Sequence, residues 1–171
     1  MGTALAAAEE FDQGADFEAL VRRHQAMVFS IAFHFLQDRS AAEELAQDVF
    51  LQLHRHLGAL QSADHVTFWL RRVTTHRCID YGRRRRVNFL RLDSVPEPGA
   101  EMSLPDPLLS RQLRALVGAL PGHARMAIVL RYQEDLTPEE IARVLDRPVA
   151  TVKSQLQRAL KTLREKMVRH A

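Results

Sequence analysis

The chain has 171 residues, of which 46% are hydrophobic, and a net charge of +3 with a pI near 9.5. This length allows one medium domain or two small ones, and the apolar content is ample for a core. A single cysteine, Cys78, excludes an intramolecular disulfide, and no apolar run reaches membrane-spanning length. Because the N-terminus also lacks the basic and then apolar pattern of a signal peptide, we expect a cytoplasmic protein without membrane insertion.

Helical periodicity dominates the chain and strand-like alternation is nearly absent, so we predict an all-α fold. A loose acidic tail precedes the first expected helix. Residues 87–107 contain four prolines and no helical period, which indicates a linker, here placed at 89–107. The sequence therefore predicts two small helical domains, at 15–88 and 108–171. Within them we expect helices over 16–36, 41–57, 67–86, 108–120 and 122–132, followed by a pair over 138–167.

The final pair is the most informative stretch. Thr137 is a good N-cap, Pro138 suits the first helical position, and Glu140 stands where a capping box requires it. Pro148 disfavours the α conformation at Arg147, so the first helix must stop there. A short helix, a tight turn and a longer helix form a helix-turn-helix, whose second helix enters the major groove of DNA.

The second helix of this pair has a polar and basic face opposite its apolar stripe. An ordinary helical hairpin with a solvated face is the alternative. Basic residues far outnumber acids over 147–171, and short polar side chains at the helix start suit close approach to bases, so DNA binding is favoured. The candidate contact residues are Thr151, Lys153, Ser154, Gln155, Arg158 and Lys161.

A second informative stretch, FWLRRVTTHRCIDYGRRRR (68–86), interleaves aromatic and basic residues. Arginines that follow phosphates beside planar stacking surfaces suit single-stranded nucleic acid. We expect Phe68 and Leu70 to be core, while Trp69 could stack on bases or join the core. The arginine run at 83–86 could be a solvated helix end, but it exceeds what the helix dipole needs, so phosphate contact is favoured.

A third stretch, RSAAEELAQDVFLQLHRHL (39–57), is an acidic amphipathic helix. Such a face cannot bind DNA, so it is either plain surface or a docking site for a basic protein. Metal and catalytic sites are not indicated: the histidines are scattered, and there is no zinc-ligand spacing, phosphate loop or nucleophile motif. We therefore expect no cofactor, no metal and no enzymatic activity.

These three stretches, in this order and separated by a linker, resemble bacterial sigma factors of the extracytoplasmic-function (ECF) group of the sigma-70 family. The resemblance covers about 16–167. It implies a transcription initiation factor that binds core RNA polymerase and directs it to promoter DNA. It also implies that the first domain captures the melted −10 element and the second reads the −35 element, and an anti-sigma factor is a common further partner in that family.

The resemblance also assigns roles to residues. It places Glu44, Leu45, Gln47, Asp48 and Phe50 on the polymerase-docking motif. On the promoter-opening helix it places Arg71, Arg72, His76, Arg77, Arg83 and Arg84, to which we add Trp69 as a stacking candidate. On the −35 reader it places Thr151, Lys153, Ser154, Gln155 and Arg158.

The chain departs from the family pattern at several positions. Asp146 and Ala150 stand where glycine is frequent, although aspartate tolerates the left-handed conformation that the turn needs. Gln155 replaces a usual arginine, which changes the expected base from guanine to adenine. His76 replaces a common asparagine in the opening helix.

Two other classes of protein remain as alternatives. A stand-alone helix-turn-helix repressor or activator would bind duplex DNA but would have no use for an acidic docking helix or an arginine run. A nucleic-acid enzyme would need a carboxylate or metal constellation that the sequence lacks.

Overall fold

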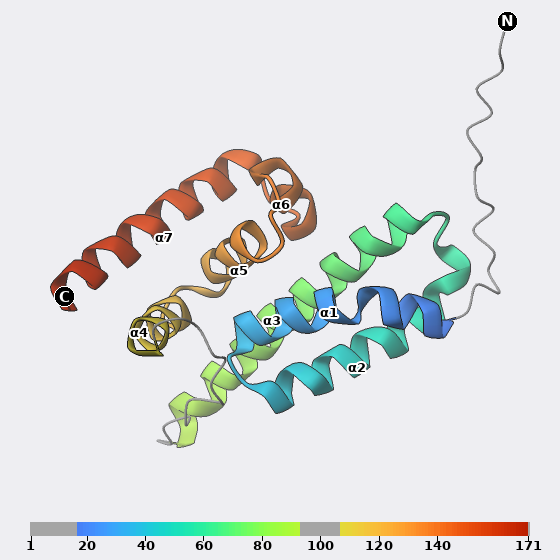
Figure 1. Cartoon of the computed structure of the whole chain (residues 1–171), viewed down its shortest axis with the longest axis horizontal. Coiled ribbons are helices and arrows are strands. Elements are labelled where there is room, and N and C mark those ends of the chain that lie inside the picture. The colour runs from blue at the N-terminus through green and yellow to red at the C-terminus, as the bar shows by residue number, and fades with distance from the viewer. Residues whose placement is uncertain (1–16, 93–106, 171) are drawn as a thin grey trace, which may run out of the picture.

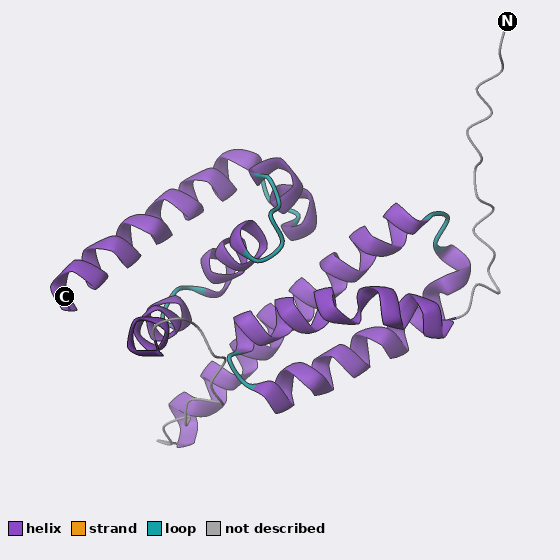
Figure 2. Cartoon of the chain, in the orientation of Figure 1, coloured by secondary structure: helices purple, strands orange, loops and turns teal. Residues whose placement is uncertain are grey.

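A computed structural model describes residues 17–92 and 107–170 of the chain, and within these ranges all regular structure is helical (Figure 2). The predicted all-α fold is therefore confirmed. In chain order the elements are α1 (Phe17–Leu36), α2 (Arg39–His56), the 3-10 turn η1 (Leu57–Ala59), α3 (Ala63–Leu92), α4 (Pro107–Gly118), α5 (Gly122–Tyr132), α6 (Pro138–Leu145) and α7 (Val149–His170).

The first three long helices pack against one another around an apolar centre (Figure 1). Phe35 of α1, Leu53 of α2 and Leu70 of α3 are almost completely buried there, and so is Cys78. Each large apolar side chain buried in this way contributes about 1.5–3 kcal/mol. The three-helix core fixes α2 and α3, which carry the predicted polymerase and −10 residues.

The remaining helices form the second packing unit. Helix α5 packs against α6 and α7, and α4 packs against α7 (Figure 1). Met126 and Leu130 of α5 meet Ile141 of α6 and Val152 of α7 in the buried interior. This interior orients α7 and leaves its opposite face to solvent.

Helix α3 is longer at both ends than the sequence predicts. It begins at Ala63, four residues before the expected start, because the Ser62 hydroxyl accepts a hydrogen bond from the His65 amide at 3.1 Å and caps the helix. It continues to Leu92, so residues 89–92 are helical rather than part of the linker. Pro107, the last residue of the predicted linker, is the first residue of α4. Residues 93–106 and the acidic tail lie outside the described residues.

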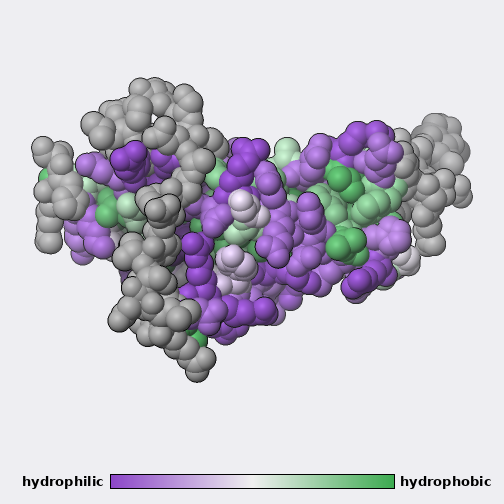
Figure 3. Space-filling model, turned by 90° about the horizontal axis from the view of Figure 1, so that it is seen from below, coloured by the Kyte–Doolittle hydropathy of each residue, from purple (hydrophilic) through white to green (hydrophobic). Residues whose placement is uncertain are grey.

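The two helical units pack on each other. Helix α5 contacts α1 and α3, and α6 contacts α3. Figure 1 shows α5 lying between α3 and α7. The surface seen in Figure 3 is largely hydrophilic, with small separate hydrophobic patches. Contact between the units is therefore a prominent additional feature of the fold, and the sequence analysis did not predict it.

Candidate DNA and polymerase interfaces

The turn before α7 has the geometry that its sequence predicts. The Thr137 hydroxyl accepts a hydrogen bond from the Glu140 amide at 3.2 Å, and the Glu140 carboxylate accepts one from the Thr137 amide at 2.8 Å. At the other end of α6, Asp146 is left-handed, with φ 54° and ψ 51°. The capping box and the left-handed aspartate therefore set where α6 begins and ends, and α7 follows at Val149.

Helix α7 has one buried and one outward side. Its buried stripe is Val152, Leu156, Ala159 and Leu163. Among the predicted −35 residues, Lys153, Arg158 and Lys161 are exposed, while Thr151 and Ser154 are half-buried at the helix start. The outward side is thus polar and basic over its first three turns.

Gln155 does not share this outward side. Its Oε1 atom is buried without a hydrogen-bond partner among the described residues. At 100° per residue, Gln155 lies beside the apolar stripe, whereas Gln157 points outward and is exposed. The sequence analysis missed Gln157, although the angular positions of the four buried residues would have found it.

The basic side chains of α7 have only weak partners. Lys153 pairs with Glu139 of α6 at 2.9 Å, and this contact lowers the pKa of the Glu139 carboxyl. Lys161 lies 3.9 Å from Glu165. Exposed pairs of this kind contribute little stability, so both lysines can exchange their partners for DNA phosphates.

The arginines of α3 take part in more ion pairs, several of them with other elements. Most of the predicted promoter-opening arginines pair with an acid, whereas Arg84 has no ion-pair partner in the part of the chain that is described. The pairs are Arg71 with Glu134 at 3.6 Å, Arg72 with Asp146 at 3.6 Å, Arg77 with Asp48 at 3.2 Å and Arg83 with Asp80 at 2.6 Å.

The aromatic residues of α3 differ from expectation in one case. Leu70 is fully buried, as predicted, but Phe68 is 38% exposed, so its assignment to the core was wrong. Phe68 is two residues from both Val66 and Leu70, which form the inward face of α3, so its side chain lies on the outside of the helix. Trp69 is half-buried, with its ring 5.5 Å from that of His56.

The predicted docking residues of the acidic helix α2 lie partly on the surface and partly in the core. Glu44, Gln47 and Asp48 are exposed. Leu45 and Phe50 are only 6% and 8% exposed, because they lie on the inward stripe of α2 and most of each side chain packs into the core. Their assignment to the docking motif stays a prediction.

A surface hollow of about 500 Å³ lies between α2 and α3. Acidic residues of α2 line one side and residues of α3 line the other, and the Asp48–Arg77 ion pair bridges them. This hollow can receive side chains of both charges from a partner. Its lining residues are Ala41, Glu44, Leu45, Asp48, Arg77, Asp80, Tyr81 and Arg84.

Several of the α3 partners belong to the other helical unit. Arg71 reaches Glu134 after α5, and Arg72 reaches both the carboxylate of Asp146 and the carbonyl of Arg143, at 3.2 Å. We use the name interdomain seam for these contacts of α3, together with the contacts that the end of α1 makes with α4 and α5. The seam therefore contains two predicted −10 residues and the turn of the helix-turn-helix.

The other side of the seam is built on α1. The Gln37 side-chain amide donates to the Arg114 carbonyl of α4 at 2.8 Å. Arg125 of α5 donates to the Phe35 carbonyl at 3.2 Å, and its guanidinium lies 5.0 Å from the centre of the Phe35 ring. Arg125 also donates to the carbonyls of Gly118 and Leu120. Polar contacts thus join the two units along the whole seam.

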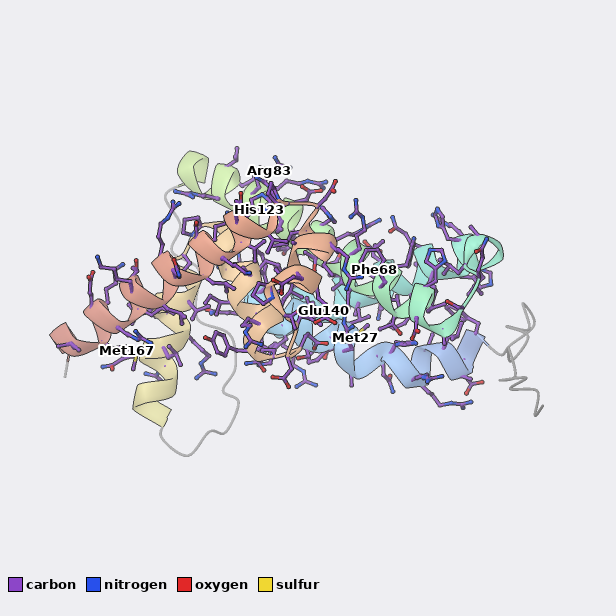
Figure 4. All side chains as sticks on the ribbon, turned by 90° about the horizontal axis from the view of Figure 1, so that it is seen from above. Met27, Phe68, Arg83, His123, Glu140 and Met167 are labelled. Carbon is purple, nitrogen blue, oxygen red and sulfur yellow. The ribbon has the colours of Figure 1, made fainter. Side chains whose placement is uncertain are left out.

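Two histidines, His76 and His123, also lie in the seam. The guanidinium of Arg147 donates to Nε2 of His123 at 3.0 Å, which requires a neutral imidazole. Burial lowers the pKa of His123, and the charges of Arg147, His76 and Arg83 lower it further. Figure 4 shows Arg83 and His123 close together. The predicted −10 residue His76 therefore lies within electrostatic reach of α5.

Within the described ranges, no cluster of three or more potential ligands could hold a metal ion. Over the same residues, no helix combines the length and apolar character needed to cross a membrane.

Comparison with known proteins places this arrangement in a family. Residues 20–87 match the family model described as Sigma-70 region 2, and residues 110–163 match the one described as Sigma-70, region 4. The solved structure of the sigma factor RpoE in complex with the anti-sigma factor NepR from Bartonella quintana is similar, with a TM-score of 0.72, 19% identity, and 88% and 95% of the two chains covered. The structure of CnrH in complex with the cytosolic domain of CnrY has a TM-score of 0.68 and 22% identity, over 93% of this chain and 94% of that one. Both show a shared fold.

Similarity to curated sequences is stronger. The chain is 32% identical to the ECF RNA polymerase sigma-E factor of Escherichia coli K12 over 170 residues, which cover 91% of this chain and 88% of that protein. It is also 32% identical to the ECF RNA polymerase sigma factor SigE of Mycolicibacterium smegmatis, over 94% of this chain but only 65% of that longer protein. Two matched regions in the expected order, and relatives of this identity and coverage, confirm the resemblance found in the sequence. The chain belongs to the ECF group of the sigma-70 family.

Proposed function

We propose that this protein is a non-enzymatic transcription initiation factor that binds core RNA polymerase and directs it to specific promoters. The observation that carries the proposal is the outward side of α7, which is polar and basic behind a capped helix-turn-helix. The polymerase performs the catalysis, so this chain needs no cofactor. It acts in the cytoplasm, where the polymerase binds chromosomal DNA.

The second domain, residues 108–171, would read the −35 element. Residues in the first turns of a recognition helix meet base edges, and cations further along meet phosphates. We assign base contacts to Thr151, Ser154 and Gln157, and phosphate contacts to Lys153, Arg158 and Lys161. Gln155 remains a candidate from the sequence, but the burial of its Oε1 favours Gln157.

The first domain, residues 15–88, would hold the melted −10 element along α3. Arg83 and Arg84 are exposed and suited to phosphates, and Trp69 offers a partly exposed ring for stacking. Arg77 lies at the α2 side of the helix. Arg71, Arg72 and His76 complete the assigned set, and they would become available to DNA once the seam opens.

Helix α2 would dock on the polymerase through Glu44, Gln47 and Asp48. Their exposure and the adjoining hollow fit a basic partner surface whose side chains enter between α2 and α3. The similar RpoE structure is a complex with the anti-sigma factor NepR, so an anti-sigma factor is a further expected partner for this chain.

Run-off transcription tests the proposed function directly. Core polymerase with this protein should transcribe from a subset of a promoter library that core polymerase alone ignores. Sequences enriched in the library should share two elements at fixed spacing. Binding to duplex DNA with equal specificity in the absence of polymerase would instead support a stand-alone repressor or activator.

The docking surface can be tested by charge reversal. Glu44→Arg combined with Asp48→Arg should weaken binding to core polymerase by several kcal/mol, because like charges would face each other at the interface. Glu43→Arg is the matched control, since Glu43 is also exposed on α2 but pairs with Arg39 at 2.9 Å. A folded double variant that binds core polymerase with unchanged affinity would contradict the assignment.

A further inference from the structure

Unsatisfied polar atoms are concentrated in the interdomain seam. Four of the six buried side-chain polar atoms that lack a hydrogen-bond partner among the described residues belong to seam residues. They are Nε of Arg71, Nε2 of His76, Nδ1 of His123 and Nε of Arg125. Buried polar atoms without partners favour an arrangement in which water reaches them. Opening of the seam would provide such an arrangement.

The charges around His123 predict that protonation of its ring favours opening. Helix α3 brings His76 and Arg83 towards it, and the turn between α6 and α7 brings Arg147. The seam carboxylates are already engaged, Asp146 by Arg72 and Glu134 by Arg71. A proton on His123 would thus face cations and would cancel the hydrogen bond that its Nε2 accepts from Arg147.

The same contacts cover residues that the proposed function needs. Arg71 is 27% exposed and ends on Glu134, while Arg72 is bound to the helix-turn-helix turn. Promoter DNA would have to displace these contacts before it could bind the two side chains. Closure of the seam and use of Arg71 and Arg72 by DNA therefore compete.

We propose that the seam is an acid-sensitive latch, which at neutral pH holds the two domains together over Arg71 and Arg72 and which protonation of His123 releases. The first part rests on the proposed function, because Arg71 and Arg72 matter only if α3 binds promoter DNA. The second part, the opening itself, is a property of the free protein.

The sign and size of the effect follow from linkage. The pKa of His123 is lowered in the closed arrangement, so the open arrangement binds the proton more tightly. The contribution of His123 to closure is complete above its ordinary pKa of about 6.5 and declines as the pH falls below that value. If His123 stays neutral when closed, the open-to-closed ratio rises up to about tenfold between pH 7.5 and 5.5.

Energy transfer between dyes on the two domains measures this ratio in the full-length protein. Asp64→Cys on α3 and Lys166→Cys on α7 provide exposed attachment points. The native Cys78 is fully buried, and burial raises the pKa of its thiol, so it stays unlabelled. Circular dichroism at each pH confirms that the helices persist.

Matched histidine variants separate the latch from general effects of acid. His123→Gln keeps a hydrogen-bond acceptor for Arg147 but cannot be protonated, so its energy transfer should be independent of pH between 7.5 and 5.5. His65→Gln removes an exposed histidine on the first turns of α3, outside the seam, and should respond like the parent protein. Any titration of Glu134, whose pKa is raised by burial against the opposing effect of Arg71, would persist in both variants.

Three results would overturn the proposal: no pH response in the parent protein, an equal response in His123→Gln, or separated domains already at pH 7.5. None of these measurements requires polymerase or promoter DNA. A failed latch would therefore leave the proposed transcriptional role standing, and a failed run-off assay would leave the energy-transfer result standing.

Discussion

Helices α3 and α7 both carry many basic residues, but the structure uses these residues differently. On α7 the buried stripe and the basic side are separate, and the lysines have only exposed neighbours on α6 or α7 itself. On α3 the arginines reach across to α2 and to the second domain. Basic composition alone therefore does not tell a DNA-contact residue from one that joins two parts of the fold.

The difference predicts how substitutions will behave. On α7, substitutions that weaken DNA binding should fall at different residues from those that lower the stability of the fold. On α3, one substitution should change both, because Arg71 and Arg72 hold the second domain as well as facing the proposed DNA path. The following predictions test this contrast, from the largest expected effect to the smallest.

Arg71→Ala should show the double role most clearly. It would leave Glu134, whose side chain is only 10% exposed, without its cation, at a cost of about 1–3 kcal/mol. Urea unfolding of the free protein measures this cost. Adding Glu134→Gln should recover most of the stability but not open-complex formation on a promoter. If the second substitution restores both, Arg71 has only a structural role.

Gln157→Arg and Gln155→Arg test the recognition side of α7. A bidentate contact to a base gives about 1–3 kcal/mol of discrimination, so Gln157→Arg should shift one position of a selected −35 library towards guanine. Gln155→Arg should leave the preferred sequence unchanged, because Gln155 lies beside the buried stripe. A shift with Gln155→Arg alone would return that residue to the reader and remove Gln157.

The structure also shows which features could be predicted from the sequence and which could not. The helix-turn-helix was predictable because its signals are local: Thr137 and Glu140 lie one turn apart, and Pro148 acts on its neighbour. The burial of Phe68, Leu45 and Phe50 depends on which face of each helix turns inward, and Phe68 and Leu70, two residues apart, cannot both lie on that face. The seam was not predictable, because Arg71 and Glu134 are far apart in sequence and their pairing depends on tertiary packing.

The capping box of α6 gives a local control for the long-range contacts of α3. Thr137→Ala should cost about 1 kcal/mol by leaving the Glu140 amide without its partner. Hydrogen bonds from Thr137 lower the pKa of Glu140, so this carboxylate supports α6 above its ordinary pKa and the support is lost as the pH falls through the lowered value. Thermal unfolding between pH 7 and 3 measures both effects. Glu140→Gln should flatten this part of the acid response, and an unchanged acid profile would count against the carboxylate.

Lys161→Ala should have the smallest and most uniform effect. Lys161 is exposed, and its only described partner is Glu165 at 3.9 Å, so its loss should leave the unfolding free energy within about 0.5 kcal/mol of the parent value. It lies on the outward side of α7 beyond the base-reading turns, where a lysine is placed for phosphate. Removing one phosphate contact should weaken promoter binding equally for all −35 sequences and reduce the slope of log affinity against log salt by about 0.9. Titrations at several salt concentrations on a preferred and a mismatched promoter measure both. A change in sequence preference would place Lys161 among the base readers, and an unchanged salt slope would remove it from the DNA interface.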